Sequence, residues 1–157
     1  MTDINSAFEA EIPGLRRYAR KLVRDEAVAE DLLQECLVRG LDKQHLWQEG
    51  SNLRAWLCTI LHNQYVNHIR RSVREGIPVA LNEVEEPLIR EPSQEKLIEL
   101  RDLDRALKQL PAGQRAAVLL IGLEDMGYEK AAKIIGVPVG TVRSRLSRGR
   151  QKLKMAA

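Results

Sequence analysis

The sequence predicts an all-α protein with two small helical domains joined by an extended acidic linker. Apolar residues recur at the three- and four-residue intervals of helices, aromatic residues make up only 4% of the chain, and no stretch alternates as a strand would. One segment, 75–92, holds three prolines and five glutamates, a composition that does not sustain a helix. It separates a first domain over residues 1–74 from a second over residues 93–157.

Two helices are expected at the start of the first domain. Residues 3–24 form one of them, with an interruption near Pro13–Gly14 because proline removes a helix hydrogen bond. Its inner face follows the i, i+3, i+4, i+7 spacing through Leu15, Tyr18, Ala19 and Leu22. Residues 26–40 form the other, which Asp25 can cap and Gly40 can end. Its apolar stripe consists of Val28, Leu32, Leu33, Cys36 and Leu37.

A polar segment, 42–51, leads into a long helix over 53–74 that starts at Asn52. The residues expected on its inner face are Leu53, Trp56, Leu57, Ile60, Leu61 and Val66. Trp56 keeps this period and is therefore assigned to the core rather than to a surface site. Three or four helices in about 74 residues make one small bundle.

The second domain is also predicted to be helical throughout. Ser93 follows Pro92 and can cap a helix that runs to Leu110 and stops before Pro111. The remaining chain divides into three helices over 112–123, 127–135 and 138–154.

The last two of these helices meet the physical requirements of a helix-turn-helix. Small Ala132 allows the helices to approach closely, and Gly136 can take the positive φ of a tight turn. Pro138 is acceptable in a first turn, where its missing N–H is not needed. Val137 and Val142 can fill the junction. The inward positions of the final helix are Val142, Leu146, Gly149 and Leu153.

The rest of this final helix is strongly basic. Six basic residues and no acidic one lie within 143–154, and residues 105–157 carry a net charge of +8. A helix in the DNA major groove needs arginine for guanine edges, small hydroxyls for close approach and flanking cations for phosphates. The alternative is a solvated charged face, although such faces usually mix both signs. The candidate DNA contacts are Thr141, Arg143, Ser144, Arg145, Ser147, Arg148, Gln151 and Lys152.

These residues carry a family resemblance. GTVRSRLSRGRQKL, preceded by LKQLPAGQRAAVLL and GYEKAAKIIG, resembles the fourth region of sigma factors of the extracytoplasmic-function type (group 4 of the sigma-70 family). DEAVAEDLLQECLVRGL resembles their region 2 helix that grips RNA polymerase, and NLRAWLCTILHNQYVNHIRR resembles the helix that opens and reads the minus-10 element. The motif NLRAWL is most similar to the sequences of the general-stress-response branch of this family.

The resemblance implies an initiation factor that binds core RNA polymerase and promoter DNA. The first domain would be sigma region 2, and its residues expected to dock on the clamp of the largest polymerase subunit are Asp31, Gln34, Glu35 and Arg39. Those expected at the minus-10 element are Trp47, Ser51, Asn52, Asn63, Asn67, Arg70, Arg71 and Arg74. The second domain would be sigma region 4, reading the minus-35 element through helix 138–154.

The resemblance also implies an anti-sigma factor as a further partner. For the acidic linker two interpretations stay open: a segment that threads the polymerase towards the RNA exit path, or a solvated tether. Met126–Gly127 departs from the leucine and serine that the family usually has there, and it removes a good N-cap from the helix at 127–135.

Several other classes are disfavoured by the sequence. His45, His62 and His68 have no metal-ligand spacing, and no nucleophile motif or phosphate-binding glycine loop occurs, so neither catalysis nor a metal or cofactor is expected. Cys36 and Cys58 are expected to be small buried hydrophobes in a reducing cytoplasm. The sequence predicts no secretory signal and no membrane span. The alternative function is a sigma-like decoy that sequesters an anti-sigma factor without binding DNA.

Overall fold

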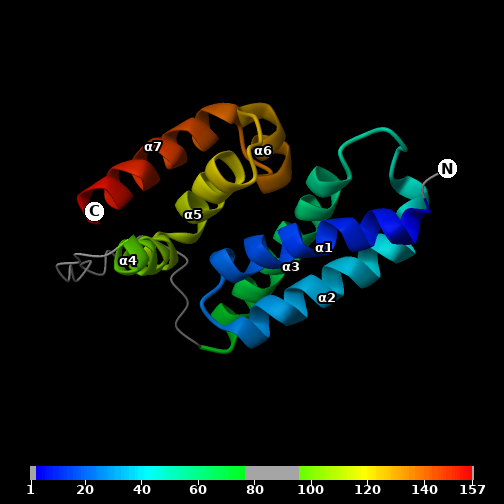
Figure 1. The fold of residues 1–157 in the computed structure, drawn as a ribbon, viewed down its shortest axis with the longest axis horizontal. Helices are drawn as coiled ribbons and strands as arrows, with labels where there is room; N and C mark the ends of the chain where they lie inside the picture. The colour runs from blue at the N-terminus through cyan, green and yellow to red at the C-terminus, as the bar shows by residue number, and fades with distance from the viewer. Residues whose placement is uncertain (1–2, 77–95, 157) are drawn as a thin grey trace.

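The protein folds into two helical halves that pack against each other (Figure 1). The computed structural model describes residues 3–76 and 96–156, with side chains of the second segment described from residue 101 onward. Most of the predicted linker, 77–92, and the predicted cap Ser93 lie outside the described residues. Every element in the described part is helical: α1 (Ile4–Leu22), α2 (Glu26–Asp42), η1 (Gln44–Leu46), α3 (Leu53–Arg74), α4 (Lys96–Gln109), α5 (Ala112–Val118), η2 (Leu119–Leu123), α6 (Tyr128–Ile135) and α7 (Val139–Ala156).

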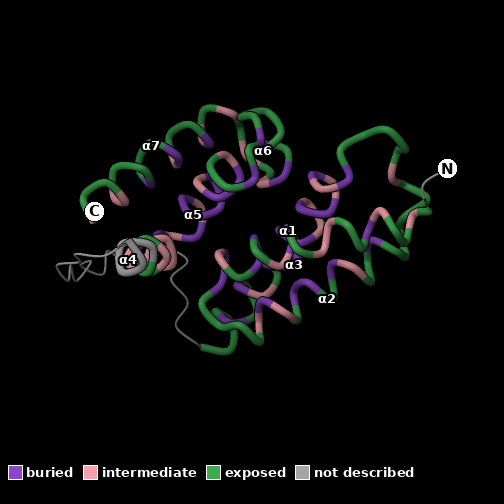
Figure 2. Tube along the Cα trace, in the orientation of Figure 1, coloured by how far each residue is buried: buried purple, intermediate pink, exposed green. Residues whose placement is uncertain are grey.

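The first half is a bundle of α1, α2 and α3 around an apolar core (Figure 2). Both predicted caps are confirmed, because Asp25 accepts hydrogen bonds from the first turn of α2 and the Asn52 carboxamide accepts one from the Ala55 amide at 3.0 Å. The predicted inner positions of α1 are all buried. Trp56 is half-buried and its ring lies edge-on to Phe8 at 6.4 Å, so it belongs to the core as expected.

Two expectations for this half are wrong. α1 is not interrupted at Pro13, which lies within the helix on its exposed side. The carbonyl that proline leaves without a donor belongs to exposed Glu9, where water can replace the lost bond. α2 does not end at Gly40 but continues to Asp42. A Cβ at position 40 would lie 2.9 Å from Cδ2 of Leu57, so this glycine permits close packing instead.

The second half contains α4 to α7 and one irregular turn. Residues 112–123 were expected as a single helix, but Leu119–Leu123 winds as a π-helical turn. The Glu124 amide donates to the Leu119 carbonyl at 3.0 Å, and Asp125 then takes a left-handed φ of 53°. This wider turn directs Glu124 towards the first half, where its side chain is buried.

Both cysteines are buried in the core, as the sequence predicts. Burial raises the pKa of the Cys36 and Cys58 thiols to about 12, so neither forms a thiolate readily. Among the helices that the structure describes, none combines the length and the apolar character needed to cross a bilayer.

His62 should make the fold sensitive to acid. It is buried on α3, its Nδ1 has no hydrogen-bond partner, and burial lowers its pKa to about 4, with nearby Arg145 adding to the effect. Between this value and the usual 6.5 the unfolded chain binds the extra proton. The His62 contribution to the unfolding free energy is therefore complete above about pH 6.5 and falls by up to about 1.4 kcal/mol per unit as pH drops towards 4.

Denaturant titrations at several pH values between about 7 and about 5 test this expectation. The His62→Gln variant should show a flatter pH dependence of the unfolding free energy than the native protein. Parallel profiles for the two proteins would contradict a buried, neutral histidine.

Candidate functional site

The helix-turn-helix predicted from the sequence is present in the structure. α6 ends at Gly136, whose φ of 80° is left-handed and whose amide donates to the Ala132 carbonyl at 2.8 Å. Gly127 caps α6 without a side-chain bond, as expected from the sequence. The buried side of α7 contains Val142, Leu146 and Gly149. A Cβ at Gly149 would lie 2.7 Å from Cγ2 of Val118, so α7 seats directly on α5.

This packing leaves a basic face of α7 in solvent. The fully exposed members of the predicted DNA-contact set are Arg143, Ser144, Ser147, Arg148 and Gln151, while Thr141 and Lys152 are half-buried at its edge. Arg145 lies apart from them, because its guanidinium rests against Gly113 of α5 and it lowers the pKa of His62 on α3. The structure therefore brings together seven of the eight candidates and turns Arg145 towards the protein.

One aromatic residue that the DNA-contact prediction omitted lies beside this face. Tyr128 is the first residue of α6, and Cζ of Arg143 is 5.3 Å from the centre of its ring. That distance is within the range of a cation–π interaction. The guanidinium is thus held over the tyrosine although both residues are exposed.

The predicted minus-10 residues form two separate groups on the first half. Trp47, Ser51 and Asn52 lie before α3, where Trp47 is half-buried against the core and Ser51 donates its hydroxyl to the Gln48 carbonyl. The second group is exposed along α3 and consists of Asn63, Asn67, Arg70, Arg71 and Arg74. The helix α3 has 22 residues, Leu53–Arg74, and rises by about 33 Å, so its basic end lies far from the cap Asn52. The two groups therefore face different parts of any bound strand.

The predicted polymerase contacts share the exposed side of α2. Asp31, Gln34, Glu35 and Arg39 are all exposed. Arg39 forms an ion pair with Glu35 at 3.2 Å. With its amide oriented to satisfy both neighbours, Gln64 of α3 donates to Glu35 at 3.1 Å and accepts from Arg39 at 2.7 Å. This row of charges is consequently ordered on the surface before any partner binds.

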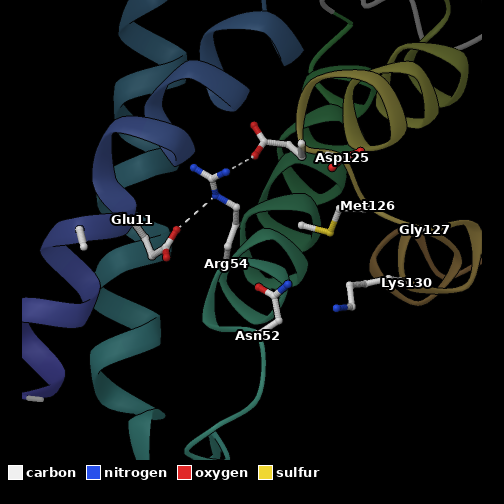
Figure 3. A pocket seen from close by; sticks show the side chains of 9 residues that line it. Glu11, Asn52, Arg54, Asp125, Met126, Gly127 and Lys130 are labelled. Carbon is white, nitrogen blue, oxygen red and sulfur yellow. Dashed lines mark ion pairs between the residues drawn. The ribbon is translucent and has the colours of Figure 1, made fainter. Parts of the chain in front are cut away.

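A charged cluster that the sequence did not indicate lies where the two halves meet, and one of its two ion pairs joins them. Arg54 of α3 lies between Glu11 of α1, at 3.2 Å, and Glu124 of the second half, at 3.0 Å (Figure 3). We call these three residues the Arg54 clasp. A Cβ at Gly14 would overlap with the Arg54 guanidinium as it lies here, so glycine in α1 gives this side chain its room. Burial raises the pKa of Glu124, while Arg54 opposes that rise.

Arg115 of α5 makes the deepest contact between the halves. Its guanidinium donates to the Leu22 carbonyl at the end of α1 and to the Leu107, Lys108 and Leu110 carbonyls around the end of α4. A cation at helix C-termini also interacts favourably with the helix dipoles. Around it, Lys21 pairs with Asp104 at 2.6 Å, and Arg24 donates to the Lys108 carbonyl at 3.1 Å. The described residues therefore form a closed arrangement in which these charged contacts accompany an apolar core shared by both halves.

No group of three or more potential metal ligands occurs among residues 3–76 and 96–156. The site chemistry in the described part is that of a binding protein: a basic helix face, a polar helix end and an ordered charged row.

Comparison with known proteins gives matches along nearly the whole chain. A family model described as sigma-70, region 4 matches residues 100–153, and one described as the sigma2 domain of PhyR matches residues 8–62. The ECF RNA polymerase sigma factor EcfG of Rhodopseudomonas palustris is 40% identical over 144 residues, covering 92% of this chain and 79% of that protein.

Two solved structures are similar in fold. The sigma factor RpoE of Bartonella quintana, in complex with the anti-sigma factor NepR, matches 99% of this chain and 97% of its own with a TM-score of 0.82 and 36% identity. The anti-anti-sigma factor PhyR of Bartonella quintana, complexed with NepR, matches 98% of this chain and 51% of its own with a TM-score of 0.62. At 16% identity that second likeness concerns the fold alone.

Loss of the Arg54 clasp should separate the two halves. The Arg54→Met variant leaves Glu124 buried without its cation, a situation that costs about 3–5 kcal/mol and that opening relieves by hydrating the carboxylate. Distances between spin labels at exposed Asp42→Cys and Lys154→Cys should lengthen and broaden, and the buried native cysteines should not take up label.

Two further variants serve as controls for this measurement. Arg70→Met removes an exposed arginine from the same helix and should leave the distances unchanged. Adding Glu124→Gln to Arg54→Met removes the buried carboxylate that has lost its ion-pair partner, and it should recover part of the closed population. An Arg54→Met protein with native distances would exclude the clasp as a closing interaction.

Proposed function

Since the chain belongs to the extracytoplasmic-function (ECF) sigma factors, it directs RNA polymerase to promoters, and we propose how its surfaces divide that task. α7 reads the minus-35 element, α2 docks on the polymerase clamp, and the two polar groups on the first half engage the minus-10 element. The observation that carries the proposal is the basic character of α7: six basic residues and no acidic one lie within 143–154, and all of them except Arg145 and Lys152 are exposed. Catalysis is left to the polymerase.

The α7 face suits the major groove in both shape and chemistry. Arg148 and Arg143 can donate two hydrogen bonds each to a guanine edge. Ser144 and Ser147 are short enough to let the helix backbone come close to the bases. Arg145 is assigned differently from its prediction, because its position against Gly113 favours a role in packing while the halves are closed.

The groups on the first half suit different parts of a melting promoter. The Arg70, Arg71 and Arg74 end of α3 offers cations and a shallow groove to the phosphate backbone. The loop end, with Ser51 and Asn52, offers small polar groups to a base that has left the stack. The Asn52 carboxamide already caps α3 through its oxygen, which leaves its NH₂ group for such a base.

Promoter binding requires the closed arrangement to open. The minus-10 and minus-35 elements lie about 25 base pairs apart, or about 85 Å at 3.4 Å per base pair. A compact domain of this length has a radius of gyration of about 15 Å, so its two reading surfaces cannot reach both elements together. The 18-residue linker 75–92 can extend to about 60 Å, which with the two halves is sufficient. Opening breaks the Arg54 clasp and the Arg115 contact with Leu22.

An anti-sigma factor that favours the closed arrangement would keep this protein from promoters. The similar RpoE structure is a complex with an anti-sigma factor, which supports a partner of this kind here. The decoy function remains the second candidate, because one matching family model is the sigma2 domain of PhyR. A decoy has no need for a basic α7 face, and the initiation factor is therefore preferred. The proposed compartment is the cytoplasm, where the polymerase is.

Run-off transcription with core RNA polymerase and a pool of genomic promoter fragments tests the proposal. Specific new transcripts should appear with this protein and disappear with the Arg143→Ala/Arg148→Ala variant. The Lys133→Ala variant, which removes an exposed cation from α6, should retain them as a matched control. A folded protein that yields no transcripts yet captures a small anti-sigma protein would establish the decoy function instead.

Arg148→Ala should specifically relax base preference. Loss of a bidentate contact to a base costs about 1–3 kcal/mol of binding to the preferred promoter and much less on other sequences. Competition binding of the holoenzyme to the preferred fragment and to single-base-pair variants measures this difference. Equal losses on all fragments would instead indicate a phosphate contact.

A further inference from the structure

Tyr128 and Arg143 come from different helices of the helix-turn-helix and meet at its surface. Tyr128 is 39% exposed at the start of α6, and Arg143 is exposed on α7. Cζ of Arg143 lies 5.3 Å from the ring centre. The face of the Tyr128 ring is the contact that the described structure gives this guanidinium. The contact is therefore an interaction between a cation and an aromatic surface.

The helix that carries the tyrosine ring, α6, is held in place by its own packing. The Ala131 amide donates to the Gly127 carbonyl at 3.0 Å, which closes the first turn of α6 around Tyr128. Three residues on the inner side of α6 are buried: Ala131, Ala132 and Ile134. The left-handed Gly136 then fixes the angle at which α7 follows. The position of the ring relative to the α7 backbone is thus set by packing rather than by the surface contact itself.

We propose that Tyr128 is a positioning residue that orients the Arg143 guanidinium for a base edge in the minus-35 element. This inference rests on the proposed function of α7 and names a determinant of its specificity. A free arginine side chain populates many rotamers and loses that freedom on binding. The tyrosine ring restricts those rotamers beforehand by holding the guanidinium over its face. An exposed cation–π contact raises the population of the arginine rotamers that make it by about two- to fivefold.

A hydroxyl contact between Tyr128 and a DNA phosphate is the competing explanation, and two substitutions separate it from positioning. Tyr128→Phe keeps the aromatic face and removes the hydroxyl. Tyr128→Leu keeps apolar bulk and removes the aromatic face. Positioning requires the phenylalanine variant to behave like the native protein and the leucine variant to lose selectivity.

The first experiment examines the free protein and does not depend on DNA. Ring-current shifts of the Arg143 Cδ protons, measured by NMR, should be present in the native protein and in Tyr128→Phe. They should be absent in Tyr128→Leu, whose amide spectrum otherwise remains native. Native-like shifts in Tyr128→Leu would overturn the contact.

The second experiment measures selectivity in the holoenzyme. The Arg143→Ala variant first identifies the base pair that Arg143 reads: it is the minus-35 base pair whose substitution weakens binding of the native holoenzyme but not of this variant. Tyr128→Leu should reduce discrimination at that same base pair by about two- to fivefold and should have no additional effect in the Arg143→Ala background. Tyr128→Phe should keep the native discrimination.

Three results would overturn the positioning role: an equal loss on every fragment, a loss in Tyr128→Phe as large as in Tyr128→Leu, or a full additional loss in the Arg143→Ala background. Failure of the proposed function gives a different pattern. In that case Arg143→Ala itself leaves the discrimination of all minus-35 base pairs unchanged while the ring-current shifts of the free protein are as expected.

Discussion

The closed arrangement combines an apolar core shared by the two halves with the guanidinium of Arg115, which is buried where the last turns of α1 and α4 meet. Burial lowers its pKa, and its cost is offset by four backbone carbonyls, of which only the Leu22 carbonyl belongs to the first half. In the Arg54 clasp a guanidinium is again held between groups of both halves, here the carboxylates of Glu11 and Glu124. Charged groups regain their hydration when an interface separates, which offsets part of the cost of exposing the apolar core. The charged contacts therefore make the closed form specific and lower the cost of opening it.

Glycines set the close contacts within the second half, and an apolar core joins that half to the first. In the second half, Gly149 lets α7 sit against Val118, and Gly136 fixes the turn between α6 and α7. Apolar side chains from α1, α2 and α3 are continuous with those of α5, α6 and α7 in one core. The basic α7 face is exposed even in the closed form, so closure does not hide it. What closure prevents is simultaneous contact with two distant DNA elements.

Local features of the fold were predictable from the sequence because each depends on neighbouring residues. The caps at Asp25 and Asn52 and the left-handed Gly136 follow from side-chain chemistry within a few positions. Pro13 and Gly40 misled the prediction because packing by the rest of the helix outweighs a single unfavourable or flexible residue. Here tertiary contacts decided the outcome.

The contacts between the halves could not be predicted in this way. Arg54 and Glu124 are 70 positions apart and lie in segments whose charges read as ordinary surface residues. Tyr128 belongs to a recognisable motif, yet its contact with Arg143 depends on the angle between two helices. The division into domains and the roles of single residues at the promoter stay predictions, since they depend on partners as well as on this chain.

Gly14 also constrains how this sequence can drift over generations. A methyl group there would occupy the space of the Arg54 guanidinium, although the backbone of α1 would tolerate alanine and even prefer it. A larger residue at position 14 therefore requires the Arg54 guanidinium to move, and its ion pair with Glu124 has to adjust with it. Positions 14, 54 and 124 are thus coupled, so a substitution at one of them changes which residues the other two can accept.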